Sequence, residues 1–251
     1  MEEITIDKKL FDQTFPLLDK FRELAPGTFK HSQNVVNMCE TVAVELGLNV
    51  DLIKCAALYH DCGKMNNPLY FAENQGDTNI HDELDPQMSY QIITRHVGDS
   101  IIHLLQIPDL PREVIDIISQ HHGDTVLQAF WNKDKKSPED KYRYRCSKPV
   151  SSEALILMLC DSIEATTRAM YNNGEGEDDF ISKAVKGTIS RLMDDQQLDN
   201  MKIGTLNTTK KILIKELESI YHKRVTYDDE SKTVAEIRED ENVWEYDVSW
   251  S

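Results

Sequence analysis

The sequence feature that most constrains the fold is a set of histidines and aspartates at the ends of apolar stripes with helical spacing. A helix that buries positions i, i+3, i+4 and i+7 turns a polar residue on the same stripe toward the interior. Few segments alternate as strands do, so we predict an all-α fold. The stripes are Val35, Met38 and Val42 after His31; Ile53, Ala56 and Ala57 before His60; Ser89, Ile92 and Ile93 before His96; Val114, Ile117 and Ile118 before His121; and Ala154, Leu157 and Met158 before Asp161.

Several helix ends are marked by capping residues. Asp85 followed by Pro86 predicts an N-cap and a helix that continues through 87–95. Pro111 predicts the start of a helix over 112–120. Residues 132–149 are rich in Lys, Asp, Ser and Pro, and we expect an exposed excursion there.

The last 24 residues differ in composition from the rest of the chain. Residues 228–251 contain nine acidic and two basic residues. Such a charge imbalance disfavours a packed core. We therefore predict one domain over residues 1–227 and a loosely ordered acidic tail over residues 228–251.

Composition excludes several classes of function. The chain has 44 acidic and 28 basic residues and a net charge of −16, which argues against binding to a DNA or RNA polymer. The longest apolar run, 154–160, is far shorter than the roughly 20 residues of a membrane-spanning helix. The five cysteines form no C-x-x-C pair, as is typical of a reducing compartment. We expect a cytoplasmic protein without a membrane segment or secretory signal, and the oligomeric state stays open.

Two further residues join the stripe residues, because Asp61 directly follows His60 and His122 directly follows His121. Any one of these histidines could be a core residue that is bonded to a carbonyl, and an interior aspartate could be a helix cap. Together they predict a metal centre, because buried carboxylates are costly unless they are paired or bound to metal. Imidazole and carboxylate donors favour Mn, Fe, Co, Ni or Zn over Mg or Ca. Seven donors suit two metals that share a bridging carboxylate and act on a phosphate.

The order H…HD…H…HH…D resembles that of the HD-domain metal-dependent phosphohydrolases. The blocks that carry the resemblance are APGTFKHS (25–32), YHDCGK (59–64), YFAENQ (70–75), QHHGDT (120–125) and LCDSIEA (159–165). They are most similar to the cytoplasmic domain of seven-transmembrane HD proteins that hydrolyse cyclic di-AMP to linear pApA. The resemblance spans 16–227 and implies an HD-domain helical bundle with a buried dinuclear metal site.

The resemblance also implies a role for each site residue. The first metal would be held by His31, His60, Asp61 and Asp161, and the second by Asp61, His96, His121 and His122. Asp61 would bridge two divalent ions, most simply Mn or Fe, and a metal-bridging hydroxide would attack the phosphate. Lys64 would contact the phosphate, with a lysine at a helix end as the alternative. Glu73 and Asn74 could orient ligands or contact a base, or they could only stabilise their loop.

We therefore expect a phosphodiesterase whose substrate is a cyclic dinucleotide, with cyclic di-AMP first among the candidates. Three alternatives stay open: a mixed-valent diiron oxygenase, an HD phosphohydrolase that acts on another nucleotide, and a protein that binds a nucleotide without cleaving it. The segment YRYR (142–145) could stack on a base or bind phosphate, or it could be part of the exposed excursion.

Overall fold

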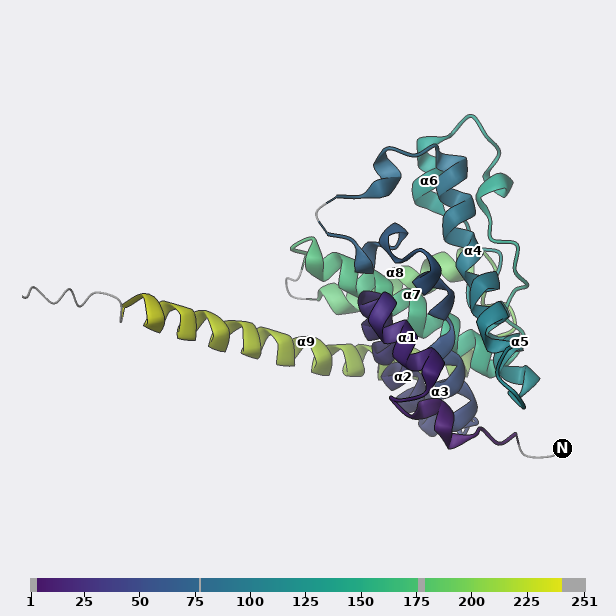
Figure 1. Cartoon of the computed structure of the whole chain (residues 1–251), viewed down its shortest axis with the longest axis horizontal. Helices are drawn as coiled ribbons and strands as arrows, with labels where there is room; N and C mark the ends of the chain where they lie inside the picture. The colour runs from purple at the N-terminus through teal and green to yellow at the C-terminus, as the bar shows by residue number, and fades with distance from the viewer. Residues whose placement is uncertain (1–3, 77, 176–178, 241–251) are drawn as a thin grey trace, which may run out of the picture.

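The structure, a computed structural model, describes residues 4–76, 78–175 and 179–240, with side chains up to Tyr221. Within these residues the chain is helical, and one isolated antiparallel bridge joins Val126 and Arg143. The all-α prediction is confirmed. The α-helices are α1 (Pro16–Leu24), α2 (Pro26–Leu46), α3 (Val50–Tyr59), α4 (Pro86–Leu104), α5 (Arg112–Ser119), α6 (Gln128–Lys133), α7 (Ser152–Asn172), α8 (Phe180–Asp194) and α9 (Ile203–Asp240) (Figure 1). Short 3-10 helices are η1 (Lys8–Phe11), η2 (Cys62–Asn66), η3 (Pro68–Tyr70), η4 (Ala72–Asn74), η5 (Ile80–Asp82) and η6 (Glu139–Tyr142).

The predicted helix starts agree with the observed ones, whereas the helix predicted over 87–95 continues to Leu104. The Asp85 carboxylate accepts hydrogen bonds from the backbone N–H groups of Gln87 and Met88, and Pro86 is the first residue of α4. Helix α5 begins directly after Pro111 and ends one residue before the expected end of the segment 112–120. Local capping chemistry therefore determines where these two helices begin.

Helix α2 is the centre of the bundle and packs against α3, α7 and α9. Its stripe residues Val35, Met38 and Val42 are completely buried. The stripe residues of α3, α5 and α7 are buried in the same core, whereas Ile92 and Ile93 of α4 are half-buried. Each fully buried aliphatic side chain of this kind contributes roughly 1.5–3 kcal/mol. The buried stripes orient their terminal histidines and aspartates toward the middle of the molecule.

The segment over residues 132–149 is more ordered and more buried than expected. Tyr142 and Tyr144 are buried, and Tyr142 packs edge-on against Tyr90 of α4. The Arg143 guanidinium donates to the carbonyl oxygen of Asp124 and forms ion pairs with Glu139 and Asp195. The prediction of an exposed excursion was therefore wrong for these three residues. In this segment the two tyrosine rings are buried, and the arginine between them connects neighbouring loops through its hydrogen bond and ion pairs.

Helix α9 extends away from the rest of the bundle and runs to Asp240 (Figure 1). The expected boundary between residues 227 and 228 falls inside this helix. Residues 241–251 of the predicted acidic tail lie outside the described residues, so the two-part division of the chain stays a prediction. In the part of the chain that is described, no helix combines the length and apolar character needed to cross a membrane.

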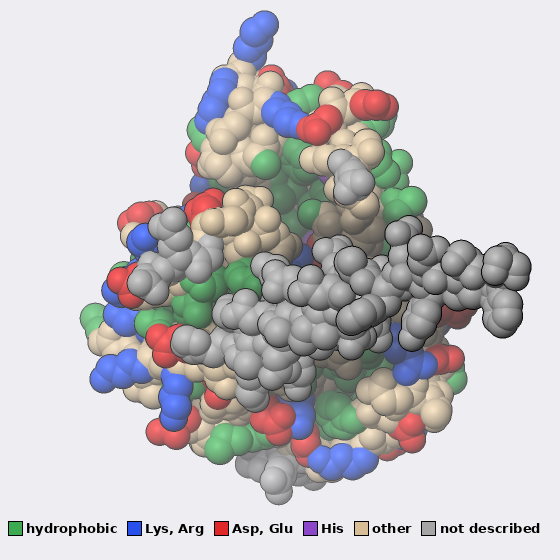
Figure 2. Space-filling view, turned by 90° about the vertical axis from the view of Figure 1, so that its left-hand side faces the viewer, with side chains coloured by type: hydrophobic (Ala, Val, Ile, Leu, Met, Phe, Trp, Pro, Cys, Tyr) green, Lys and Arg blue, Asp and Glu red, His purple; other side chains and the backbone are tan. Residues whose placement is uncertain are grey.

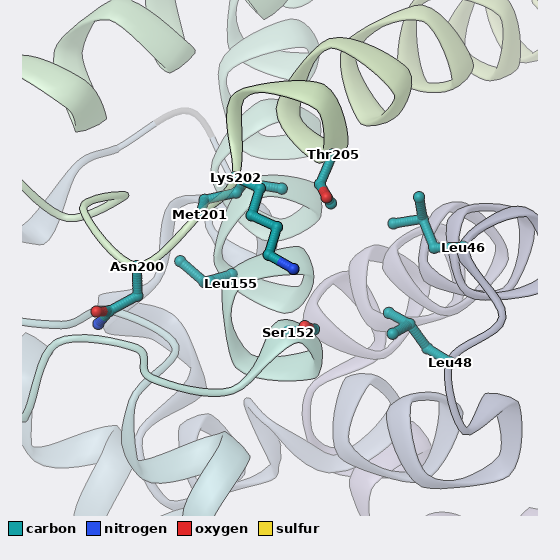
Figure 3. Close-up of a pocket in the computed structure, with 8 residues that line it drawn as sticks. All are labelled: Leu46, Leu48, Ser152, Leu155, Asn200, Met201, Lys202 and Thr205. Atoms are coloured by element: carbon teal, nitrogen blue, oxygen red, sulfur yellow. The ribbon is translucent and has the colours of Figure 1, made fainter.

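A cavity of about 200 Å³ lies between the end of α2, the beginning of α7 and the beginning of α9 (Figure 3). Its wall combines apolar side chains such as Leu46 and Leu155 with the polar side chains of Asn200 and Lys202. None of the predicted site residues lines this cavity.

The turn that follows α3 packs closely against α4, and this close approach requires a glycine. A Cβ atom at Gly63 would lie 2.3 Å from the carbonyl oxygen of His96 and 2.4 Å from the backbone nitrogen of Ser100. The Gly63 N–H also donates to the Ser100 hydroxyl at 2.8 Å. The absence of a side chain therefore allows the turn that carries His60 and Asp61 to reach the helix that carries His96.

We expect Gly63→Ala to lower the free energy of unfolding by about 1–3 kcal/mol or more, because α4 must move away from the turn. Gly98→Ala is the matched control, since Gly98 also lies in this region, within α4, but a Cβ there meets nothing within 4 Å. Gly98→Ala should leave the stability unchanged or raise it by about 0.5–1 kcal/mol. Urea unfolding of both variants measures the difference, and equal stabilities would contradict the close approach.

Candidate metal centre

Five parts of the fold bring all seven predicted ligand residues together. Their donor atoms form two groups, and within each group the atoms lie within 4.8 Å of one another. Asp61 belongs to both groups. The first group is His31 from α2, His60 and Asp61 from the turn after α3, and Asp161 from α7; the second is Asp61, His96 from α4, and His121 and His122 from the turn after α5.

Three of the histidines are oriented by the same kind of hydrogen bond to the backbone. In each, the ring Nδ1 lies within hydrogen-bonding distance of the backbone carbonyl three residues earlier in the chain. A carbonyl only accepts, so Nδ1 carries the hydrogen, and Nε2 is the nitrogen that faces the centre and can bind a metal ion in the neutral ring. Metal-binding histidines are commonly fixed in this way. The pairs are His60 with Ala57 at 2.8 Å, His96 with Ile93 at 2.5 Å, and His121 with Ile118 at 2.6 Å.

His31 is oriented by a carboxylate instead. Its Nδ1 lies 2.5 Å from Oε2 of Glu164, and its Nε2 lies 3.0 Å from Oδ1 of Asp161. Glu164 in turn accepts from the Asn34 amide at 2.9 Å and pairs with Arg168 at 3.2 Å. Glu164 is not among the site residues predicted from the sequence. The available signal was its spacing, because Glu164 lies three residues after Asp161 and therefore on the same face of α7.

Unpartnered buried atoms show that the residues fit a metal. His60 Nε2, His121 Nε2 and Asp61 Oδ1 are buried without a hydrogen-bond partner. The Nε2 atoms of His96 and His122 lie 3.1 Å apart, and His96 Nε2 lies 3.2 Å from Asp61 Oδ1. Lone pairs that face one another at these distances repel unless a cation lies between them. The donor set of imidazole and carboxylate suits a divalent transition metal.

The electrostatics of the two groups differ. Burial disfavours charge on Asp61 and Asp161, but nearby imidazoles outweigh it and hold the pKa of both carboxyls well below the usual range. The burial of His60 also opposes charge, yet Asp61 and Asp161 raise its pKa to about 10. In the second group, burial and the neighbouring histidines lower the pKa of His121 to about 3. Without a metal ion, the carboxylates of the first group therefore favour the charged form of the His60 imidazole, whereas burial in the second group favours the neutral form of the His121 imidazole.

Lys64 lies beside the shared carboxylate. Its Nζ is 2.7 Å from Oδ2 of Asp61 and 3.0 Å from Oε1 of Glu73. Burial opposes the charge of Lys64, but these carboxylates raise its pKa above the ordinary value. Glu73 also accepts from the Thr28 hydroxyl, and the Asn74 amide donates to that same hydroxyl. The structure thus places Glu73 and Asn74 in one network with Lys64 at the beginning of α2, and their contact with a substrate stays a prediction.

The centre is largely closed to solvent. Six of its seven residues are buried, and the side chain of His122 is 20% exposed. Figure 2 shows only small areas of histidine surface, which lie in a hollow of the molecular surface. The Tyr144 ring stacks on His122, with ring centroids 4.3 Å apart and planes at 28°. The sequence suggested this tyrosine as a surface for stacking, but it did not show that the partner would be one of the chain's own predicted ligands.

The chain is similar to known proteins over most of its length. The HD domain family matches residues 28–166. The cyclic-di-AMP phosphodiesterase PgpH of Bacillus subtilis is 37% identical over 233 residues, which are 90% of this chain and 32% of that protein. The chain therefore spans about a third of the length of this curated relative.

Solved structures agree with this result. The HD domain of the Listeria monocytogenes phosphodiesterase PgpH matches with a TM-score of 0.78 and 37% identity, covering 83% of this chain and all of that one. The same domain in complex with cyclic-di-AMP matches with a TM-score of 0.75 and 36% identity, covering 82% of this chain and 97% of that one. The resemblance expected from the sequence blocks is confirmed, and the chain belongs to the HD-domain family.

Proposed function

We propose that this chain is a metal-dependent phosphodiesterase that hydrolyses cyclic di-AMP to linear pApA at a centre of two divalent ions, manganese or iron. The observation that carries the proposal is the pair of donor groups that share Asp61. One group alone would supply a single metal site. Two groups with a common carboxylate supply the arrangement of ligands that a dinuclear phosphohydrolase needs.

The charges of the centre are compatible with two divalent ions and an anionic substrate. Arg168 offsets the charge of Glu164, and Lys64 offsets that of Glu73. Asp61 and Asp161 then contribute two negative charges. Two divalent cations would leave the centre with a local charge of about +2, which attracts a phosphodiester although the whole chain carries −16.

Bound ions would supply Lewis acidity toward the phosphate and a water nucleophile that is activated at neutral pH. Four of the five histidines, His31, His60, His96 and His121, keep their donor nitrogens in place through the carbonyl and carboxylate contacts, so little reorganisation is needed during the reaction. The Lys64 ammonium donates to Glu73 and forms an ion pair with Asp61, and its three N–H groups allow a further hydrogen bond to a phosphate oxygen. Lys64 would thereby stabilise the charge that develops on that oxygen.

The substrate is proposed from the relatives. The Bacillus subtilis protein is named a cyclic-di-AMP phosphodiesterase, and the Listeria domain has been solved with cyclic-di-AMP. The substrate-binding roles of Glu73 and Asn74 belong to this proposal, supported by their network beside Lys64. A cytoplasmic location also belongs to it, since all five cysteines are free.

The first test removes the shared carboxylate. Asp61→Asn should lower kcat/KM for cyclic di-AMP by more than about 100-fold. Mutation of a residue that only supports a metal ligand already costs about 10–100-fold in affinity or activity, and Asp61 is itself a proposed ligand. Asp99→Asn is the matched control: Asp99 is also a buried aspartate and pairs with Arg95 outside the centre. Chromatography of the products measures turnover, and thermal melting of both variants establishes that they fold. Full activity of a folded Asp61→Asn variant would contradict the proposal.

The second test concerns the lysine. Lys64→Met should lower kcat by about 100-fold or more, with the bound metal retained, because a donor to the phosphate oxygen is lost. The control is Lys54→Met, which removes a lysine that pairs with Glu40 at 2.7 Å away from the centre. Metal analysis accompanies the kinetics. An unchanged kcat with full metal content would show that Lys64 has a structural role only.

The third test separates hydrolysis from the alternatives. A chelator should abolish turnover, and Mn²⁺ should restore it in the absence of oxygen, because hydrolysis needs no change of metal oxidation state. An oxygenase would need iron and oxygen, and a binding protein would return the dinucleotide intact. The substrates are cyclic di-AMP, cyclic di-GMP and the mixed AMP–GMP dinucleotide, each followed by chromatography. Faster cleavage of a guanine-containing substrate would overturn the proposed base preference.

A further inference from the structure

His122 is held differently from the other histidines of the centre. His31 is fixed by Glu164, and the remaining three are fixed by the carbonyl three residues earlier. In the described part of the chain, the His122 Nδ1 has no hydrogen bond to an oxygen, and Asp161 Oδ2 lies 3.8 Å away. The side chain is also the most exposed of the seven. Its orientation as a ligand therefore depends on something other than a hydrogen bond.

Tyr144 is the residue that supplies this constraint. Its ring lies almost parallel to the His122 ring at a centroid separation of 4.3 Å, and it meets the His96 ring edge-on at 6.2 Å. The backbone of Tyr144 is also tied to the turn that carries His122. Its N–H donates to the Thr125 carbonyl at 2.9 Å, and the Thr125 hydroxyl donates to the His122 carbonyl at 2.8 Å.

The tyrosine ring also borders open space. Tyr144 lines a cavity of about 400 Å³ together with Val97, Gly98 and Ile101 of α4 and with Cys146. Loss of the ring would join this space to the side of the His122 imidazole. The imidazole could then rotate about its side-chain bonds, and water could reach it from that side.

We propose that Tyr144 is a positioning residue that holds His122 in the orientation needed to bind one of the two metal ions. The inference rests on the dinuclear centre of the proposed function. The effect is expected at one ion, because the ligand rings that Tyr144 contacts are those of His96 and His122, which both belong to the second group. The stacking face of the ring, rather than its hydroxyl, carries the effect.

The test is titration of the metal-free full chain with Mn²⁺ by calorimetry, with electron paramagnetic resonance to detect a coupled Mn²⁺ pair. Wild type should bind two ions. Tyr144→Ala should bind one ion as wild type does and the other about 10–100-fold more weakly. A loss of this size is typical when a residue that supports a metal ligand is removed. Tyr144→Phe keeps the stacking face and should retain both affinities.

Tyr142→Ala is the matched control, because it removes another buried tyrosine ring from the same segment that contacts Tyr90 rather than a ligand. It should retain both ions even if its melting temperature falls. If Tyr144→Ala does not fold, Tyr144→Leu replaces it, since leucine fills space without a flat face.

The outcomes are distinguishable. Unchanged affinities in Tyr144→Ala or its leucine substitute, or an equal loss at both ions, would overturn the positioning role and leave the proposed function intact. A wild-type protein that binds fewer than two ions would contradict the dinuclear centre itself, and the inference would fall with it.

Discussion

The structure depends on one electrostatic constraint: two carboxylates and several bare imidazole nitrogens face one another in the interior. Asp61 and Asp161 are buried within 4 Å of histidine nitrogens whose own hydrogens are turned away toward backbone carbonyls or toward Glu164. An arrangement of acceptors without donors is unfavourable in a low-dielectric interior. It becomes favourable when cations occupy the middle, because each lone pair then has a partner.

The surrounding residues act on this centre through successive contacts. Glu164 orients His31 and is itself neutralised by Arg168, while Lys64 lies between Asp61 and Glu73. The turn with His60 and Asp61 reaches α4 because position 63 has no side chain. The geometry that makes the donor residues a centre comes from these supporting contacts.

Much of the centre was predictable from the sequence, since apolar periodicity determines which side of a helix is buried. This reasoning identified His31, His96 and Asp161 as interior residues, and adjacency in the chain added Asp61 and His122. It could not find the carbonyl bonds that select the tautomer, because these depend on where a helix ends. Nor could it find the burial of Tyr142 and Tyr144, which depends on contacts with Tyr90 and His96 of α4. The role of Glu164 could have been predicted from its spacing, because it lies three residues after Asp161 on the same helix.

The distribution of the ligands along the chain has a consequence for stability. His31 and Asp161 are separated by 130 positions yet share one hydrogen bond, so a cation bound by both would link helix α2 to helix α7. Binding to the native but not the unfolded chain stabilises the native state in proportion to the logarithm of free ion concentration. If ions bind as proposed, the stability of this fold in a cell would depend on the supply of divalent metal.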